Sequence, residues 1–408
     1  MIQATVEAAP EPRAVFAHYM VCFAVNGENV EAYKREIREA QAAGIDGFAL
    51  NEGAWTNEPH YLRRTSLLFQ AAKELETDFR FIFSLDLATL QAQYIPEIIK
   101  GYVNNPNYYR YKGRRLVSTF SGDQRVDWKS LLSQLKAEQY DICFVPFFYP
   151  RPRVTELPDY DTVKTLAAKW ADTVDGLFFF GAAGTDTQLA ACVRNYACVM
   201  HENGKLFMAG CSPGYWGTAQ RNRRYFEMRG GAGVETQWKA IIESSPDFVE
   251  IVTWNDLNES YICPITNPTH PNHAGFLELT KYYIHWYKTG QQPPIKDAMF
   301  YSYRLHPKAA VAPQDKPVTV FHGDVKDVIH LTLMLTALAE LRVTTGTMTV
   351  TNSAPAGITQ LEVPFTPGPQ HFEVYRDGKC LLKTDGERIQ SAPEHYNFFP
   401  TSGFVYAK

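Results

Sequence analysis

The feature that most constrains the fold is an alternation of short apolar runs with amphipathic segments, repeated eight times between residue 14 and about residue 290. The strand-like runs are residues 15–23, 47–50, 79–85, 116–120, 142–148, 176–180, 206–209 and 248–253. Between them, apolar residues recur at three- and four-residue spacing, as Val30, Tyr33 and Ile37 do, which indicates helices. Eight strand–helix units predict a parallel sheet of the α/β class, closed into a (β/α)8 TIM barrel.

A doubly wound open sheet is the competing architecture for such an alternation. It usually carries a phosphate-binding G-x-G-x-x-G turn after its first strand. No such turn follows residues 15–23. The barrel is therefore the favoured interpretation.

The pattern changes after Tyr287, where a Gly- and Pro-containing linker follows. From about residue 314 the chain alternates strand-like runs with Asp-Gly turns, at Asp377-Gly378 and Asp385-Gly386. This pattern predicts a small antiparallel β-sandwich. We expect a catalytic barrel over residues 1–300 and a C-terminal accessory sandwich over residues 301–408, which has no Trp and is expected to brace the barrel rather than bind polymer.

Charge and composition narrow the choice of partner. The chain has 408 residues and a net charge of −4, so it offers no electrostatic footprint for nucleic acid or an anionic membrane. No apolar run reaches the 18 or so residues of a membrane span. The start, Met1-Ile-Gln-Ala, lacks the basic and apolar segments of a secretory signal, which is either removed or never present. Aromatic residues, at 13%, fit a neutral carbohydrate partner.

Seven cysteines are too few and too scattered for a disulfide scaffold, and no C-x-x-C pair occurs. They are Cys22, Cys143, Cys192, Cys198, Cys211, Cys263 and Cys380. A metal site is not expected, and a single disulfide stays open.

The strongest chemical signal is the eighth strand-like run, which ends in Trp254-Asn255-Asp256, with Glu259 three residues further on. Barrel enzymes place their active sites at the carboxyl ends of the strands. Paired carboxylates beside an indole suit glycosidic cleavage: one group donates a proton, the other activates water or attacks, and a ring covers the sugar. The structural alternative is a strand end capped by solvated acids.

Polar and aromatic residues at other strand ends would meet at the same mouth. Asp86 is a third carboxylate, able to bind sugar hydroxyls or the water, or alternatively to cap a helix. The predicted substrate-binding residues are Trp254, Tyr215, Trp216, Trp55 and Tyr149 for ring stacking, Asn51, Asn255 and His18 for hydroxyl groups, and Tyr19 beside them. A basic cluster of Arg221, Arg223, Arg224 and Arg229 follows the seventh strand and is expected to be solvated or paired with acids.

As a mechanism we expect Glu259 to be the general acid and Asp256 the general base, with the reverse assignment open. A separation of the carboxyl carbons of about 6.5–9.5 Å leaves room for water and predicts inversion, and about 5–5.5 Å predicts retention.

Several segments together resemble the fungal α-1,3-glucanases, or mutanases, of glycoside hydrolase family 71. They are Val15-Phe-Ala-His-Tyr-Met20, Phe83-Ser-Leu-Asp86, Pro246 to Asp256, Glu259-Ser260, Tyr301 to Pro307 and Tyr396-Asn-Phe398. The resemblance implies a barrel with an appended sandwich, inverting hydrolysis of α-1,3-glucan in fungal cell walls, and neither metal nor cofactor. It also implies that catalysis falls to two acids, which match Asp256 and Glu259.

The chain departs from the family pattern at two places. Leu257-Asn258 replaces an aromatic–glycine pair, and the sixth strand ends in Gly181-Ala-Ala-Gly184, where the family has a nearby Trp. Both changes remove expected contacts to sugar rings. A glycosidase of different linkage and a glucan-binding protein without turnover therefore stay as alternatives. The expected location is extracellular or in the cell wall, with an intracellular form as the alternative.

Overall fold

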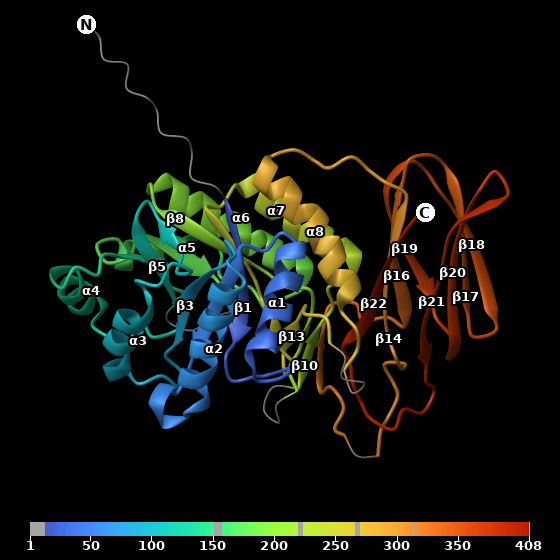
Figure 1. Cartoon of the computed structure of the whole chain (residues 1–408). Coiled ribbons are helices and arrows are strands. Elements are labelled where there is room, and N and C mark those ends of the chain that lie inside the picture. The colour runs from blue at the N-terminus through green and yellow to red at the C-terminus, as the bar shows by residue number, and fades with distance from the viewer. Residues whose placement is uncertain (1–12, 151–156, 219–222, 266–269, 314, 408) are drawn as a thin grey trace, which may run out of the picture.

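The structure is a computed structural model that describes residues 13–150, 157–218, 223–265, 270–313 and 315–407. Figure 1 shows two parts side by side: a curled sheet covered by helices, and a stack of strands formed by the C-terminal third. None of the helices in these ranges is long and apolar enough to cross a membrane.

The central sheet contains eight parallel strands. They are β1 (Ala14–Met20), β2 (Gly47–Glu52), β3 (Arg80–Asp86), β5 (Arg114–Phe120), β6 (Ile142–Phe144), β7 (Gly176–Phe179), β8 (Leu206–Cys211) and β11 (Phe248–Ile251). Their order is β6-β5-β3-β2-β1-β11-β8-β7, and the two-residue β4 (Arg110–Tyr111) pairs antiparallel with β5. Each strand corresponds to one of the eight apolar runs, so the predicted α/β alternation is confirmed.

The two edge strands of this sheet approach each other. The Asp175 amide donates to the Phe144 carbonyl at 2.9 Å, and the Phe178 amide donates to the Pro146 carbonyl at 2.8 Å. No regular ladder joins β6 to β7. The sheet is thus a curled, partial barrel, and the fully closed barrel stays a prediction.

Eight helices cover the sheet: α1 (Val30–Ala42), α2 (His60–Glu74), α3 (Ile95–Tyr102), α4 (Trp128–Ala137), α5 (Tyr160–Trp170), α6 (Asp186–Glu202), α7 (Gly231–Ser244) and α8 (Ala274–Thr289). Several begin at a capping side chain. Asn29 accepts from the Ala32 amide before α1, and Asp127 accepts from the Ser130 amide before α4. These bonds satisfy amides that have no partner within the helix, so the caps fix where the helices begin.

Short strands extend from the carboxyl ends of β8 and β11. The strands β9 (Tyr215–Trp216), β10 (Arg224–Phe226) and β15 (Val320–His322) form one small sheet. The strands β12 (Asn255–Asp256) and β13 (Ser260–Tyr261) form a hairpin. Two three-residue 3-10 helices, Trp55–Asn57 and Ala92–Tyr94, lie in loops.

The C-terminal part contains two four-stranded antiparallel sheets. One has the order β19 (Gly357–Pro364), β16 (Val328–Leu335), β14 (Ala298–Arg304), β22 (Pro400–Tyr406), and the other β18 (Met348–Ala354), β17 (Ala339–Thr345), β20 (Gly368–Arg376), β21 (Lys379–Ile389). Buried residues of both sheets, such as Leu331 and Phe372, form a core distinct from that of the helical part. This arrangement fits the predicted sandwich. The predicted boundary at residue 300 lies within β14 and stays a prediction.

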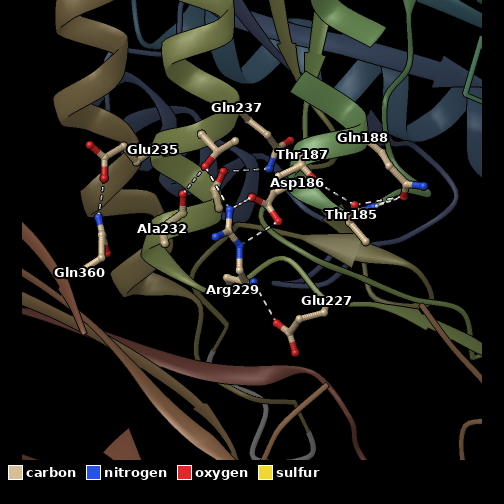
Figure 2. Close-up of polar contacts among 12 residues, drawn as sticks. Thr185, Asp186, Thr187, Gln188, Glu227, Arg229, Ala232, Glu235, Gln237 and Gln360 are labelled. Carbon is tan, nitrogen blue, oxygen red and sulfur yellow. Dashed lines mark hydrogen bonds and ion pairs between the residues drawn. The ribbon is translucent and has the colours of Figure 1, made fainter. Parts of the chain in front are cut away.

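Polar contacts and rings join the two parts. Gln360 on β19 donates to Glu235 on α7 at 2.6 Å (Figure 2). From the C-terminal segment, Phe398 and Phe399 are buried in the core of the helical part. The two parts therefore share a well-packed junction.

All seven cysteines are free thiols in the structure, so the disulfide left open by the sequence does not form.

Candidate active site

The two predicted catalytic carboxyls lie on the hairpin after β11. The Trp254 amide donates to the His18 carbonyl at 2.7 Å, which ties the base of the hairpin to β1. The Thr253 hydroxyl donates to the Ser260 carbonyl at 2.5 Å and accepts from the Asp256 amide at 2.7 Å. Asp256 Oδ1 in turn accepts from the Asn258 amide at 3.0 Å. These bonds fix the loop that carries both carboxyls.

Asp256 and Glu259 are both half-buried. Burial, and then the charge of Glu259, raises the pKa of Asp256 to about 7. Glu259 is half-buried and lines an open cavity. Asp86, at the end of β3, also has a raised pKa, mainly through burial, while its carboxylate accepts from the Ala88 amide. The Asp256 carboxyl thus holds its proton toward neutral pH, as a general acid requires.

The cavity beside Glu259 has a volume of about 210 Å³. It brings Glu259 together with Tyr149 and Tyr215, two of the residues predicted to stack on sugar rings. The other residues that line it are Phe120, Phe147, Leu157, Phe179, Phe180, Gly181, Ala182, Ala183, Leu189 and Arg224. Ring faces and edges beside a carboxylate are the chemistry of a sugar-binding pocket.

The departure at residues 181–184 lies in the wall of this cavity. Gly181 has φ +61°, and an added Cβ would come within 3.1 Å of the Phe179 ring. Glycine and the two alanines that follow leave space where a larger side chain would reduce the cavity. Leu257 and Asn258, the other departure, lie in the sequence between the two predicted catalytic carboxyls.

Two of the predicted stacking residues lie in the core instead. Trp254 is fully buried, donates its indole N–H to Glu36 Oε2 at 3.0 Å, and packs on Phe48. Trp55 is 1% exposed and donates its indole N–H to Glu97 Oε1 at 2.9 Å. Neither ring offers a face to a substrate in this structure, because position at a strand end does not fix the direction of the side chain.

The remaining predicted residues surround the site as supports. Trp216 is buried against Phe399 with ring centroids 5.1 Å apart, and Tyr19 is buried against Phe48. Asn255 is fully buried and bonds the amide and carbonyl of Met20, so its side chain is engaged with β1. Asn51 is buried near Asp86 and helps to lower that carboxyl's pKa.

The sequence interpretation missed Glu250. Its carboxylate lies 2.6 Å from Nδ1 of His18, and both side chains are almost completely buried. The signal was present in the sequence, since Glu250 is a carboxylate in the middle of the apolar strand Phe248-Val-Glu-Ile251. A buried carboxylate without a structural reason points to function.

The arginines of the basic cluster that lie in the described part of the chain contact other residues. Arg229 binds Asp186, and Arg223 donates to the Lys316 carbonyl at 2.8 Å. Arg224 lines the cavity and lies over the Tyr215 ring. Arg221 lies outside the described residues. Within those residues, no group of three or more His, Cys, Asp or Glu side chains is arranged to hold a metal ion.

Comparison with known proteins shows which protein family the chain matches. The model of glycosyl hydrolase family 71 matches residues 11–408. A mutanase of Penicillium rubens is 30% identical over 413 residues, covering 95% of this chain and 88% of the relative. A glucan endo-1,3-alpha-glucosidase of Schizosaccharomyces pombe is 29% identical over 406 residues, covering 92% and 91%.

One solved structure shares the fold. The GH99 endo-alpha-mannosidase from Bacteroides thetaiotaomicron matches with a TM-score of 0.53 and 17% identity, over 69% of this chain and 99% of that chain. At this identity the match shows a common fold alone.

Proposed function

The chain belongs to glycosyl hydrolase family 71 and is a glycoside hydrolase, and from this premise we propose that it hydrolyses α-1,3-glucan internally along the chain. The observation that carries the proposal is the position of Glu259, which lines a cavity rich in aromatic rings and lies three residues after Asp256. Relatives named for this activity align over nearly the whole chain.

In the proposed mechanism both carboxyls take part in one inverting step. Asp256 donates its proton to the departing glycosidic oxygen, because burial keeps it protonated toward neutral pH. Glu259 lines the open cavity, where it removes a proton from the attacking water. This assignment reverses the sequence-based expectation of Glu259 as the acid. The raised pKa of Asp256 and the place of Glu259 in the cavity lining support it.

We assign the other residues of the proposed site by their positions around the cavity. Tyr149 and Tyr215 contact the sugar rings, and Asp86 binds a sugar hydroxyl group or the attacking water. The backbone hydrogen bonds between the edge strands β6 and β7 support closure of the sheet into a complete barrel around this mouth. We place the catalytic barrel at residues 1–300 and the bracing sandwich at 301–408.

We also propose that the enzyme acts outside the cell or in the cell wall. One relative, 25% identical over 387 residues, is named an ascus wall endo-1,3-alpha-glucanase of Schizosaccharomyces pombe. An α-1,3-glucan of the wall is the matching substrate.

Reducing-end release from insoluble α-1,3-glucan tests the function. We expect wild-type enzyme to release soluble sugar, and Asp256→Asn and Glu259→Gln each to lower kcat by about 10²–10⁴-fold, as loss of a general acid or base does. Both variants should still sediment with the glucan. Retention on glucan without release by the wild type would identify a binding protein instead. Release from another α-glucan but not from this one would identify a glycosidase of different linkage.

A further inference from the structure

We propose that Glu250 is a positioning residue for hydrolysis, because it holds the imidazole of His18 in a fixed orientation beneath the carboxyls of Asp86 and Asp256. The proposal rests on the proposed function, since it assigns a role within the same site. Nothing in the family pattern of two acids requires a carboxylate at this position.

The geometry comes from two neighbouring parallel strands. Glu250 on β11 pairs with Phe16 on β1, and His18 lies two residues further along β1 on the same face. The His18 Nδ1 to Glu250 Oε1 distance of 2.6 Å is that of a strong, charge-assisted hydrogen bond. The Phe180 ring packs edge-on against the imidazole at 5.0 Å. The ring of His18 is therefore held on two sides.

The pair is too buried to be a surface salt bridge. Glu250 is fully buried and His18 is 1% exposed, so an unpaired charge on either would be costly. A buried ion pair usually contributes less to stability than a well-packed apolar pair of similar size. Stability alone therefore gives little reason for a carboxylate in the apolar strand β11.

The charged and titratable groups around His18 belong to the active site. They are Glu250 on β11, Asp86 at the end of β3 and Asp256 on β12, and the Asp256 carboxyl is coupled in turn to Glu259. A positive His18 favours the ionised forms of Asp86 and Asp256 and so lowers both pKa values against the larger effect of burial. Through its bond to His18, Glu250 sets how strongly that counter-charge acts on the catalytic acid.

A layer of buried polar side chains lies on the strands beyond β1. Asn51 on β2 pairs with Ser84 on β3, and Ser84 pairs with Ser118 on β5. All three side chains are buried, and each has a polar atom with no hydrogen-bond partner among the described residues. Glu250 Oε2 is also without a hydrogen-bond partner among them. The buried side chains of this layer are polar, whereas the core of an ordinary barrel is apolar.

The experiment compares Glu250→Gln, His18→Gln and the double variant by pH profiles of kcat and KM on soluble α-1,3-gluco-oligosaccharides. Glu52→Gln is the matched control, because Glu52 is an equally buried barrel carboxyl that bonds Thr65 on α2. Wild-type turnover is measured first, and its absence would refute the proposed function rather than the role of Glu250.

We expect Glu250→Gln to lower kcat about tenfold with KM within about twofold, as a misoriented group does. When the charge of His18 is lost, the pKa of Asp256 rises. The limb of the pH profile that Asp256 sets therefore moves about one unit to higher pH. The direction is the same whether Asp256 acts as acid or as base. His18→Gln should give the same movement, and the double variant should be no worse than His18→Gln. If Glu250→Gln folds poorly, the His18→Gln profile makes the same comparison.

Three results would overturn the proposal. The first is a pH profile whose Asp256 limb does not move in Glu250→Gln and His18→Gln. The second is a double variant whose loss of kcat is the product of the two single losses. The third is a Glu52→Gln profile whose limb moves as far as that of Glu250→Gln.

Discussion

At the scale of single residues, the protein buries several carboxyls in its helical part, and their contacts differ. Burial raises the pKa of Glu36 to about 7, of Glu52 to about 8 and of Asp256 to about 7. Glu36 bonds the Trp254 indole and Glu52 bonds the Thr65 hydroxyl, which are structural roles. Of these three, Asp256 is the one coupled to Glu259, whose carboxyl lines an open cavity. A raised pKa therefore identifies a catalytic group only together with its position.

Glu52 gives a prediction for stability. Between the unfolded pKa of about 4.3 and the folded pKa of about 8, the folded protein keeps a proton that the unfolded chain has lost, so Glu52 lowers stability as pH rises. Glu52→Gln removes this penalty. We expect the variant to gain stability relative to wild type, by the order of 1–3 kcal/mol at pH 8.5 and by little at pH 4.5. Urea unfolding at both pH values measures it, and an equal difference at both would contradict the buried, protonated state.

The sequence predicts where a residue lies along a strand, but it does not predict the direction in which the side chain points. Asp256 and Glu259 follow a buried strand directly, so their place at its carboxyl end could be predicted. Trp254 and Trp55 follow strands in the same way, but their indole N–H groups bond Glu36 and Glu97 and draw the rings inward. Those partners are distant in sequence, so the single sequence did not reveal them.

At the scale of elements, the β12–β13 hairpin carries the two proposed catalytic carboxyls. Thr253 bonds both of its arms, to the Ser260 carbonyl and the Asp256 amide. We expect Thr253→Val to cost about 1–3 kcal/mol of stability, because two buried groups lose their partner. We also expect a roughly tenfold or greater fall in kcat, because the Asp256 carboxyl is no longer fixed.

Oligosaccharide hydrolysis and thermal unfolding measure these two effects. The control is Thr344→Val, since the Thr344 hydroxyl bonds Thr349 on the exposed face of the sandwich. Full kcat in Thr253→Val would show that the hairpin does not need this bond.

All eight strands of the parallel sheet were predictable, because each is an apolar run bounded by polar turns. Other strands of two or three residues, such as β9, β10, β12 and β13, were not. Such short strands are stabilised by distant partners, as when β10 pairs with β15 almost a hundred residues later. These short strands therefore form through tertiary contacts and could not be predicted from the local sequence pattern.

At the scale of the whole molecule, the C-terminal segment supports the catalytic hairpin. Phe399 is 1% exposed, with its ring 5.1 Å from Trp216 on β9 and 5.1 Å from Tyr261 on β13. The sandwich and the helical part thus meet directly behind the site. This contact supports our proposal that the C-terminal sandwich braces the helical part.

Phe399→Ala tests that coupling. We expect a loss of about 3–5 kcal/mol from the cavity it leaves, and a fall in kcat as Tyr261 and the hairpin relax. Phe404→Ala is the control, because the half-buried Phe404 ring packs on the exposed Tyr406 ring. Calorimetry and turnover assays measure both variants. Unchanged kcat despite a large loss of stability would separate the bracing module from catalysis.

The most direct measurement of the central claim is proton NMR of the first-formed anomer during cleavage of an α-1,3-gluco-oligosaccharide. A water activated by Glu259 and a proton from Asp256 predict that the new reducing end appears first as the β-anomer and then mutarotates. An α-anomer as the first product would contradict the inverting pair.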